Sequence, residues 1–131
     1  MYKRQALGLL IATTATTFSQ VYRYKAYAFN YKSITEYGWT DWDGWKSVNI
    51  PVVVDATGQR IVILSETEQN YAIMKYEGEY MDENRNTISS FYCVDSRGIA
   101  CRIRLVRRLE GGAEIYIGYK DMMWAYGLTG Y

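Results

Sequence analysis

The turn pattern Asp-x-x-Gly occurs twice in this chain, at Asp55–Gly58 and Asp95–Gly98, each time between two runs of residues that favour β-strands. The flanking runs are Val48–Val54 and Arg60–Leu64 for the first turn, and Ser89–Val94 and Ile99–Arg108 for the second. In such a connection the Asp side chain accepts backbone hydrogen bonds, while the Gly takes the left-handed conformation of a bulge. Both segments therefore predict β-hairpins with three-residue loops.

Further short runs rich in Val, Ile, Tyr, Thr and Phe predict more strands. These are Tyr22–Lys32, Tyr71–Tyr76, Thr87–Tyr92, Ala113–Tyr119 and a C-terminal element, Met122–Tyr126, with turns at Asp82–Asn86 and Gly111-Gly112. Because nearly every connection is as short as a hairpin, we predict an all-β antiparallel meander of about seven to eight strands, closed as a small up-and-down barrel or half-barrel. A sandwich of two sheets is the alternative.

Residue alternation predicts which side chains face the core. In Cys101–Leu105 the odd-numbered residues are expected to point inward, and Arg102 and Arg104 to point into water. Pro51 lies inside a predicted strand but has no N–H to donate, so it is expected to face an open edge or a bulge.

The first twenty residues differ from the rest, because Lys3 and Arg4 precede an apolar run, Ala6–Ala12, that leads to small residues near Gln20. This order is typical of a secretory signal peptide, and the run is shorter than the roughly 20 apolar residues of a membrane span. We expect residues 1–20 to be a signal peptide cleaved after Ser19 or Gln20. Residues 21–131 would then form a single all-β domain in the periplasm or outside the cell. A buried N-terminal helix or strand is the alternative.

The composition excludes several classes of function. The chain has no histidine, which rules out Ser-His-Asp and Cys-His catalysis and histidine metal sites. Residues 21–131 carry thirteen basic and fourteen acidic side chains, so no global charge attracts nucleic acid. The basic strip Arg102, Arg104, Arg107 and Arg108 is expected to pair with acidic groups on neighbouring strands. No second apolar span or basic amphipathic helix predicts stable membrane insertion after cleavage.

Cys93 and Cys101 are the only cysteines and flank the second Asp-x-x-Gly turn. The hairpin places them directly opposite each other, and in an exported chain this arrangement predicts a disulfide. Two reduced core cysteines are the alternative, because opposed strand positions do not always meet disulfide geometry. A redox-active dithiol is disfavoured, since the C-x-x-C spacing is absent.

Trp39, Trp42 and Trp45 recur every three residues, with Asp41 and Asp43 between them. A period of three fits neither a strand nor a helix, so the indoles are expected to fan out from an irregular segment. They would either plug one end of a barrel or stack on a sugar or an apolar ligand whose hydroxyls contact the carboxylates. Trp42 is expected to be the most exposed of the three, because its acidic neighbours must stay hydrated, and the other two are expected to be buried.

Acidic residues outside this segment do not predict a cofactor. Asp82–Asn86 begins like a calcium-binding EF-hand loop, but Thr87 stands where the loop needs Gly and Cys93 where it needs a bidentate Glu. We therefore expect a polar hairpin loop, with no cofactor and no metal. Glu77 and Glu79 could form a glycosidase pair only at a defined separation, and are expected to lie on a solvated face.

Four segments carry a resemblance to a known group: Phe18-Ser19-Gln20, Trp39-Thr-Asp-Trp42, Phe91–Asp95 with Cys101–Val106, and Asp121–Trp124. In these segments the chain resembles short exported proteins of unknown function from gut bacteria of the Bacteroidales type. The resemblance implies export and implies no chemistry, because the group has no established activity.

The sequence thus predicts an exported, non-enzymatic β-domain with a binding or structural role. Its ligand would be apolar or sugar-like, held near Trp39, Asp41, Trp42, Asp43 and Trp45. The partner would be a small molecule, a glycan or a protein, and not nucleic acid. A hydrolase that uses acidic side chains, with Asp41 and Asp43 as candidates, is the alternative.

Overall fold

The computed structural model describes residues 21–130 of the 131-residue chain. The strands are β1 (Val21–Thr35), β2 (Gly38–Trp39), β3 (Lys46–Asp55), β4 (Arg60–Ile63), β5 (Gln69–Met81), β6 (Thr87–Asp95), β7 (Ala100–Arg107), β8 (Ala113–Gly118) and β9 (Met122–Gly130). Within this part of the chain no helix is long and apolar enough to cross a membrane. The predicted signal peptide, residues 1–20, lies outside the described residues.

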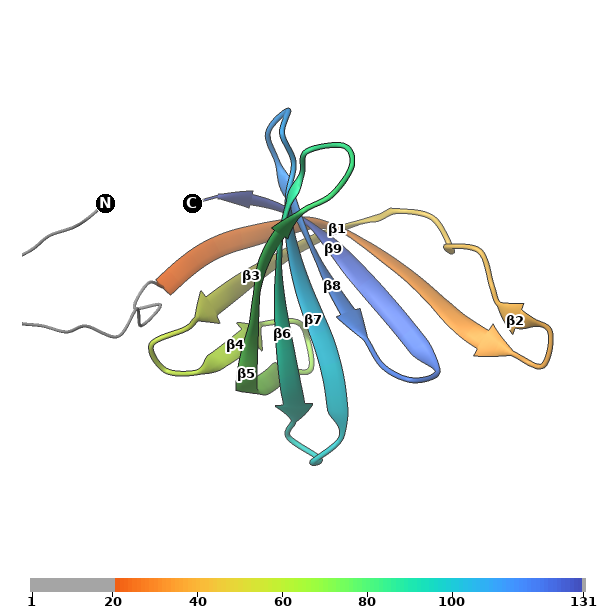
Figure 1. Cartoon of the computed structure of the whole chain (residues 1–131). Coiled ribbons are helices and arrows are strands. Elements are labelled where there is room, and N and C mark those ends of the chain that lie inside the picture. The colour runs from red at the N-terminus through yellow and green to blue at the C-terminus, as the bar shows by residue number, and fades with distance from the viewer. Residues whose placement is uncertain (1–20, 131) are drawn as a thin grey trace, which may run out of the picture.

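Eight of these strands close into an antiparallel barrel. They follow the order β1-β3-β4-β5-β6-β7-β8-β9, and β9 returns to pair with β1 from Tyr24↔Gly130 to Ser33↔Met122 (Figure 1). The ninth strand, β2, pairs only with the end of β1, at Ile34↔Trp39 and Thr35↔Gly38. The predicted all-β meander barrel is therefore confirmed, with one additional strand outside the ring.

The two Asp-x-x-Gly turns fold differently. At the second, the Asp95 N–H donates to the Ile99 carbonyl at 2.9 Å and Gly98 has a φ of 83°, which confirms the predicted three-residue loop with a left-handed Gly. In the first, Asp55 pairs with Arg60 and the left-handed residue is Gln59, with a φ of 55°. The prediction of a three-residue loop was wrong for this turn.

Gly58 has a steric role in the first turn instead. Its N–H donates to Asp55 Oδ1 at 2.8 Å, and a Cβ at Gly58 would lie 2.5 Å from Asp55 Oδ2. The Asp55 carboxylate that caps the turn therefore occupies the space that a side chain at position 58 would need.

The core fills the inside of the barrel with alternate residues of each strand. In β7 the side chains of Cys101, Ile103 and Leu105 are buried as predicted, while Arg102 is exposed. The other buried apolar residues of this cluster are Ala26, Val52, Val54, Ile61, Ile63, Tyr71, Phe91, Cys93, Ala113, Ile115, Ile117, Tyr126 and Leu128.

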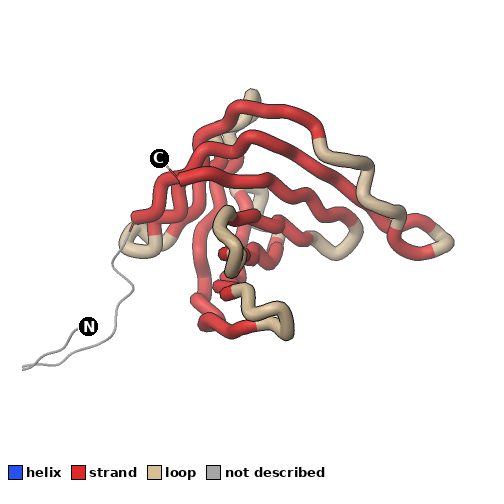
Figure 2. Tube along the Cα trace, turned by 90° about the horizontal axis from the view of Figure 1, so that it is seen from above, coloured by secondary structure: helices blue, strands red, loops and turns tan. Residues whose placement is uncertain are grey.

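A bulge in β1 and the early end of β4 both shape the barrel wall. A bulge between Ala26 and Ala28 bends β1, whose far end continues beyond the barrel and projects as a hairpin with β2 (Figures 1 and 2). The short strand β4 ends at Ile63, and the Leu64 N–H donates to the Pro51 carbonyl at 2.9 Å. The nitrogen and the carbonyl of one strand residue point to the same side, so the Pro51 nitrogen also points toward Leu64, just past the end of β4. Pro51 therefore lies where the ladder has ended and no N–H is needed, as expected.

Candidate functional site

The hairpin of β1 and β2 turns at Thr35–Gly38. The Thr35 hydroxyl donates to the Gly38 carbonyl and accepts from the Tyr37 N–H, both at 3.1 Å. Gly38 has a φ of 103°, a conformation that residues with a side chain rarely adopt. The turn leaves the Tyr37 side chain 92% exposed, so the hairpin presents a large aromatic ring at its tip.

The segment that follows, residues 40–45, runs back along the free side of β1. The N–H groups of Thr40 and Asp43 donate to the carbonyls of Ser33 and Tyr31, each at 2.8 Å. The Gly44 N–H donates at 2.8 Å to Oδ1 of Asn30, whose side chain is buried. The segment is irregular, as its sequence predicted, but these bonds hold its backbone in one path.

The three tryptophans, Trp39 in β2 and Trp42 and Trp45 on this segment, have different surroundings. Trp42 is half-buried, with its ring in edge contact with Tyr116 at a centroid distance of 6.0 Å. The Lys32 ammonium lies 4.7 Å from the Trp42 ring centroid and 5.5 Å from that of Trp39. Trp39 and Trp45 are 43% and 52% exposed. Trp39 and Trp42 thus share the Lys32 ammonium, and the three indoles form no aromatic cluster within residues 21–130.

The predicted order of exposure was wrong, because Trp39 and Trp45 are more exposed than Trp42. Asp41 and Asp43 are both exposed, so their hydration does not require the indole between them to be exposed. Trp42 packs against the outward face of β8 through Tyr116, whose neighbours Ile115 and Ile117 point into the core. The side chain that was expected to be free is therefore the one that attaches the segment to the barrel.

The carboxylates of the segment do not converge on a cleft. Asp43 forms an ion pair with Lys46, and both side chains are more than half exposed. No ion pair is found between Asp41 and another residue of the described chain. The arrangement offers two exposed indoles, one free carboxylate and one paired carboxylate, which suits the stacking and hydrogen bonding of a sugar ring.

Other residues close the barrel end that the tryptophans were predicted to plug. Gln69 Oε1 accepts hydrogen bonds from the Tyr71 hydroxyl at 2.7 Å and from the Trp124 indole N–H at 3.2 Å. Its Nε2 donates to the Tyr126 hydroxyl at 2.9 Å and to Ser65 Oγ at 3.0 Å. Every hydrogen-bonding position of the Gln69 amide is used, so this network has a structural role. No sequence motif marked it, since its members lie far apart in the chain.

Asp95 continues this polar lining at the second Asp-x-x-Gly turn. Its side chain is only 8% exposed, and burial alone would raise its pKa. Hydrogen bonds from the Tyr119 hydroxyl at 2.6 Å, the Ile99 N–H at 2.9 Å and Arg97 hold the pKa of this carboxyl well below its usual range instead. Asp95 is therefore a fully bonded turn anchor.

Cys93 and Cys101 lie directly opposite each other across β6 and β7, as predicted, but they form no disulfide. Asp95 and Ile99 are a hydrogen-bonded pair of the ladder, and such pairs recur every second residue, so Cys93 and Cys101 are also a hydrogen-bonded pair. In these pairs the Cα atoms are about 5.5 Å apart, and the side chains lie farther from each other than in the non-hydrogen-bonded pairs. Burial raises the pKa of Cys93 to about 12 and that of Cys101 to about 11. The reactive thiolate is thus disfavoured, and both residues act as core side chains.

Glu77 and Glu79 are both exposed to solvent, as predicted, but they do not share one face of the strand. A bulge lies between Tyr76 and Gly78, and as a result Glu77 accepts from Ser90 at 2.9 Å while Glu79 lies 3.4 Å from Ser89. Consecutive residues of β6 point to opposite faces, so the two carboxylates diverge.

Each of these carboxylates is paired with an arginine of the basic strip. Arg102 donates to Glu77 through Nε at 2.8 Å and Nη2 at 2.9 Å, and these bonds lower the pKa of Glu77. Arg107 contacts Glu79 at 2.6 Å, and Arg108 pairs with Glu114. The predicted pairing of the strip is confirmed for Arg102, Arg107 and Arg108, whereas no ion pair of Arg104 is found within residues 21–130.

The Asp82–Asn86 loop is the predicted polar hairpin. Asp82 Oδ1 accepts from the N–H groups of Asn84 and Asn86, each at 2.9 Å. Across residues 21–130 no group of three or more acidic or cysteine side chains is placed to hold a metal ion.

The comparisons with protein-family models, with curated proteins and with solved structures gave no match to this chain.

Proposed function

We propose that this chain is an exported, non-enzymatic binding domain that holds a neutral carbohydrate on Trp39 and Trp45. The observation that carries the proposal is the split among the three tryptophans: Trp42 is packed against the barrel, while its two neighbours are about half exposed. Exposed indoles on an otherwise anchored segment are unfavourable for a domain with no partner, because they keep large apolar surfaces in water.

The segment is prepared for binding before a ligand arrives. Its backbone is held by hydrogen bonds to Ser33, Tyr31 and Asn30, and Lys32 lies against two of the indole rings. The protein therefore loses little conformational entropy when a ligand binds. A rigid aromatic side chain also presents a flat apolar face on which a sugar ring can stack.

The charges around the platform favour a neutral sugar over an acidic one. Asp41 has a free carboxylate that can accept hydrogen bonds from hydroxyl groups. The Lys32 ammonium already lies against two indole faces, and Lys46 is paired with Asp43. Lys32 keeps its charge in these ring contacts and balances that of Asp41, so the platform has no excess positive charge to attract an acidic sugar.

Export supports a glycan as the partner class, since the leader and the resemblance to exported bacterial proteins both imply a location where glycans are present. The near balance of acidic and basic residues argues against nucleic acid.

The test is a binding screen of the purified protein against neutral polysaccharides by native affinity electrophoresis, followed by tryptophan fluorescence titration with the best oligosaccharide. Trp45→Ala and Trp39→Ala should each weaken binding by about 10-fold or more, as expected for stacked aromatic anchors. Tyr80→Ala, which removes a ring of similar exposure (51%) on β5, should bind like the parent. Failure of the whole panel to retard the protein, or equal affinity in all three variants, would refute the proposal.

A further inference from the structure

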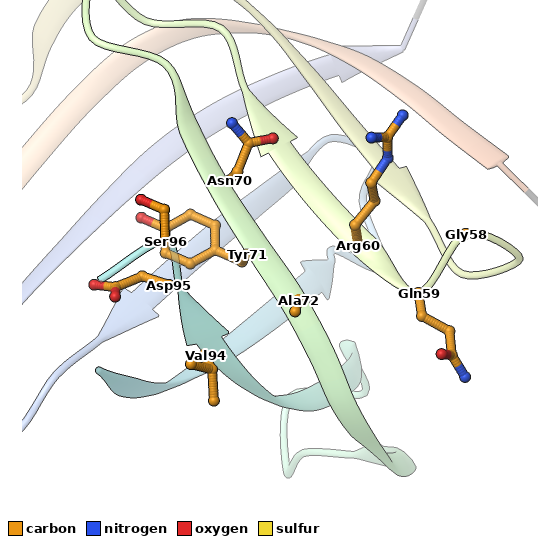
Figure 3. Close-up of a pocket in the computed structure, with 9 residues that line it drawn as sticks. All are labelled: Gly58, Gln59, Arg60, Asn70, Tyr71, Ala72, Val94, Asp95 and Ser96. Carbon is orange, nitrogen blue, oxygen red and sulfur yellow. The ribbon is translucent and has the colours of Figure 1, made fainter. Parts of the chain in front are cut away.

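A shallow groove lies along the barrel wall at β4, β5 and β6, and its lining includes the outward residues Asn70, Ala72 and Val94. It has a volume of about 360 Å³ and lies between the β3–β4 turn and the start of the β6–β7 turn. Figure 3 shows Ala72 on the groove floor between Val94 on one side and Arg60 with Gln59 on the other. The cross-strand register gives the same order, with Arg60 opposite Ala72 and Ala72 opposite Val94.

The floor belongs to a wider apolar strip on a face that should be polar. Alternate residues of β3, β4 and β5 point into the core at Val52, Val54, Ile61, Ile63 and Tyr71. The residues between them therefore face outward. This outward set is apolar at Val53, Val62, Ala72, Val94 and Ala100 and polar at Arg60 and Asn70. An antiparallel sheet with one solvated face normally carries polar residues there, so the strip is suited to contact with another surface.

Cations border this strip. Arg23 lies opposite Val53, Lys25 lies opposite Pro51, and Arg60 lies opposite Ala72. Within residues 21–130 none of these three side chains forms an ion pair. Asp55, the other cross-strand neighbour of Arg60, accepts the Gly58 N–H within its own turn. The three cations outnumber this carboxylate, so the border of the strip carries a net positive charge.

The hairpin of β1 and β2 has the opposite character. Its tip, residues 34–41, carries Glu36 and Asp41 and has no basic residue. It exposes Tyr37 at 92%, the most exposed large apolar side chain of the described chain, and Ile34 at 45%. The tip is thus apolar and acidic, which complements the strip in both respects.

The two surfaces cannot meet within one molecule. Figure 1 shows the β2 hairpin projecting on one side of the barrel, while β4 and its turn lie on the other side, and no contact between β2 and any strand but β1 is found. We propose that the hairpin tip of one copy docks in the groove of a second copy, with Tyr37 over Ala72 and Val94 and with Glu36 beside Arg60.

This contact joins two different patches, so it is heterologous and repeats from copy to copy. Such contacts generate a ring when the rotation closes and an open chain when it does not. The groove lies between two hairpin turns, and a projecting hairpin reaches its floor more readily than a flat lipid surface does. The inference goes beyond the proposed glycan site. Trp39 and Asp41 of that site also lie on the tip, whereas Trp45 belongs only to the glycan site and Tyr37 only to the contact between copies.

The test is sedimentation velocity of the purified protein over a range of concentrations. The parent should form species larger than a monomer whose proportion rises with concentration. Tyr37→Ala and Arg60→Glu should each weaken self-association by about 10-fold or more, because each removes one half of the contact. Tyr80→Ala is the matched control and should assemble like the parent. Circular dichroism checks that every variant folds, as expected for exposed positions.

A mixing experiment separates a head-to-tail contact from any symmetric one. A variant with a defective tip (Tyr37→Ala) still has an intact groove, and a variant with a defective groove (Arg60→Glu) still has an intact tip. Each alone should be monomeric, and an equimolar mixture should stop at the dimer. Combining Glu36→Arg with Arg60→Glu in one chain should restore assembly by exchanging the two charges.

Several results would overturn the inference. These are a parent that stays monomeric at all concentrations, assembly that survives both single variants, or a monomer whose Arg60-dependent binding is to phosphatidylglycerol vesicles instead. Trp45→Ala distinguishes this inference from the proposed function, since it should lose glycan binding and keep self-association.

Discussion

The Gln69 network allows a quantitative test of what holds the barrel end together. Replacing Gln69 by Ala removes the hydrogen-bond partner of the Tyr71 and Tyr126 hydroxyls, whose side chains are only 2% and 3% exposed. A buried polar group left without a partner costs about 1–3 kcal/mol. Gln69 itself is half-buried, which lets water reach part of the vacated space. We therefore expect Gln69→Ala to lower the free energy of unfolding by about 2–3 kcal/mol.

The assay is urea unfolding followed by circular dichroism, with the slope of each transition compared between variants. Asn70→Ala is the matched control. Asn70 is the next residue, lies on the outward face and donates its amide only to Glu68, at 2.6 Å, so its loss should change stability by less than about 0.5 kcal/mol.

A double-mutant cycle then tests the mechanism. In the parent, Tyr126→Phe removes one hydrogen bond and should cost about 1 kcal/mol. In the Gln69→Ala background the same change removes a hydroxyl that has no partner, so it should cost nothing or stabilise the protein. Equal costs in the two backgrounds, or a Gln69→Ala variant within about 0.5 kcal/mol of the parent, would show that the network does not act as described.

Two further predictions follow from groups with shifted pKa values. The pKa of Asp95 is low in the folded state, so its stabilising effect is present above the unfolded pKa of about 3.9 and is lost as the pH falls toward the folded value. The urea midpoint should therefore fall less steeply between neutral and acid pH in Asp95→Asn than in the parent. Identical slopes would contradict the assignment. Burial raises the pKa values of Cys93 and Cys101, so Ellman's reagent at pH 8 should react slowly with the folded protein. After denaturation it should titrate two thiols per chain. A denatured chain without a titratable thiol would show the reasoning to be wrong.

Most of the fold could be predicted from short stretches of the chain. The Asp95–Gly98 turn and the Gly111-Gly112 turn fold as expected, with positive φ at Gly98, Gly111 and Gly112. The first turn was predicted less well, because the Asp-x-x-Gly pattern is compatible with two loop lengths. Which loop forms depends on the register of β3 and β4, where Asp55 pairs with Arg60.

The candidate site could be located from the sequence but not described. The spacing of the tryptophans correctly predicted the irregular segment at residues 40–45, although Trp39 itself lies in β2. The partial burial of Trp42 could not be predicted, because it depends on Tyr116, which lies on β8 more than seventy positions along the chain. The glutamine network and the bulge that separates Glu77 from Glu79 were missed for the same reason.

The sequence was sufficient for everything that depends on neighbouring residues: the strand character, the hairpin turns, the inward and outward faces of β7, and the opposed position of Cys93 and Cys101. These follow from turn chemistry and from the two-residue period of a strand. Closure of the barrel brings β1 and β9 together, and residues as distant as Lys25 and Thr129 then share a hydrogen bond. Only that closure determined which polar groups are satisfied, that the two thiols stay reduced inside the core, and which tryptophans remain exposed, because burial is set by packing partners from distant parts of the chain.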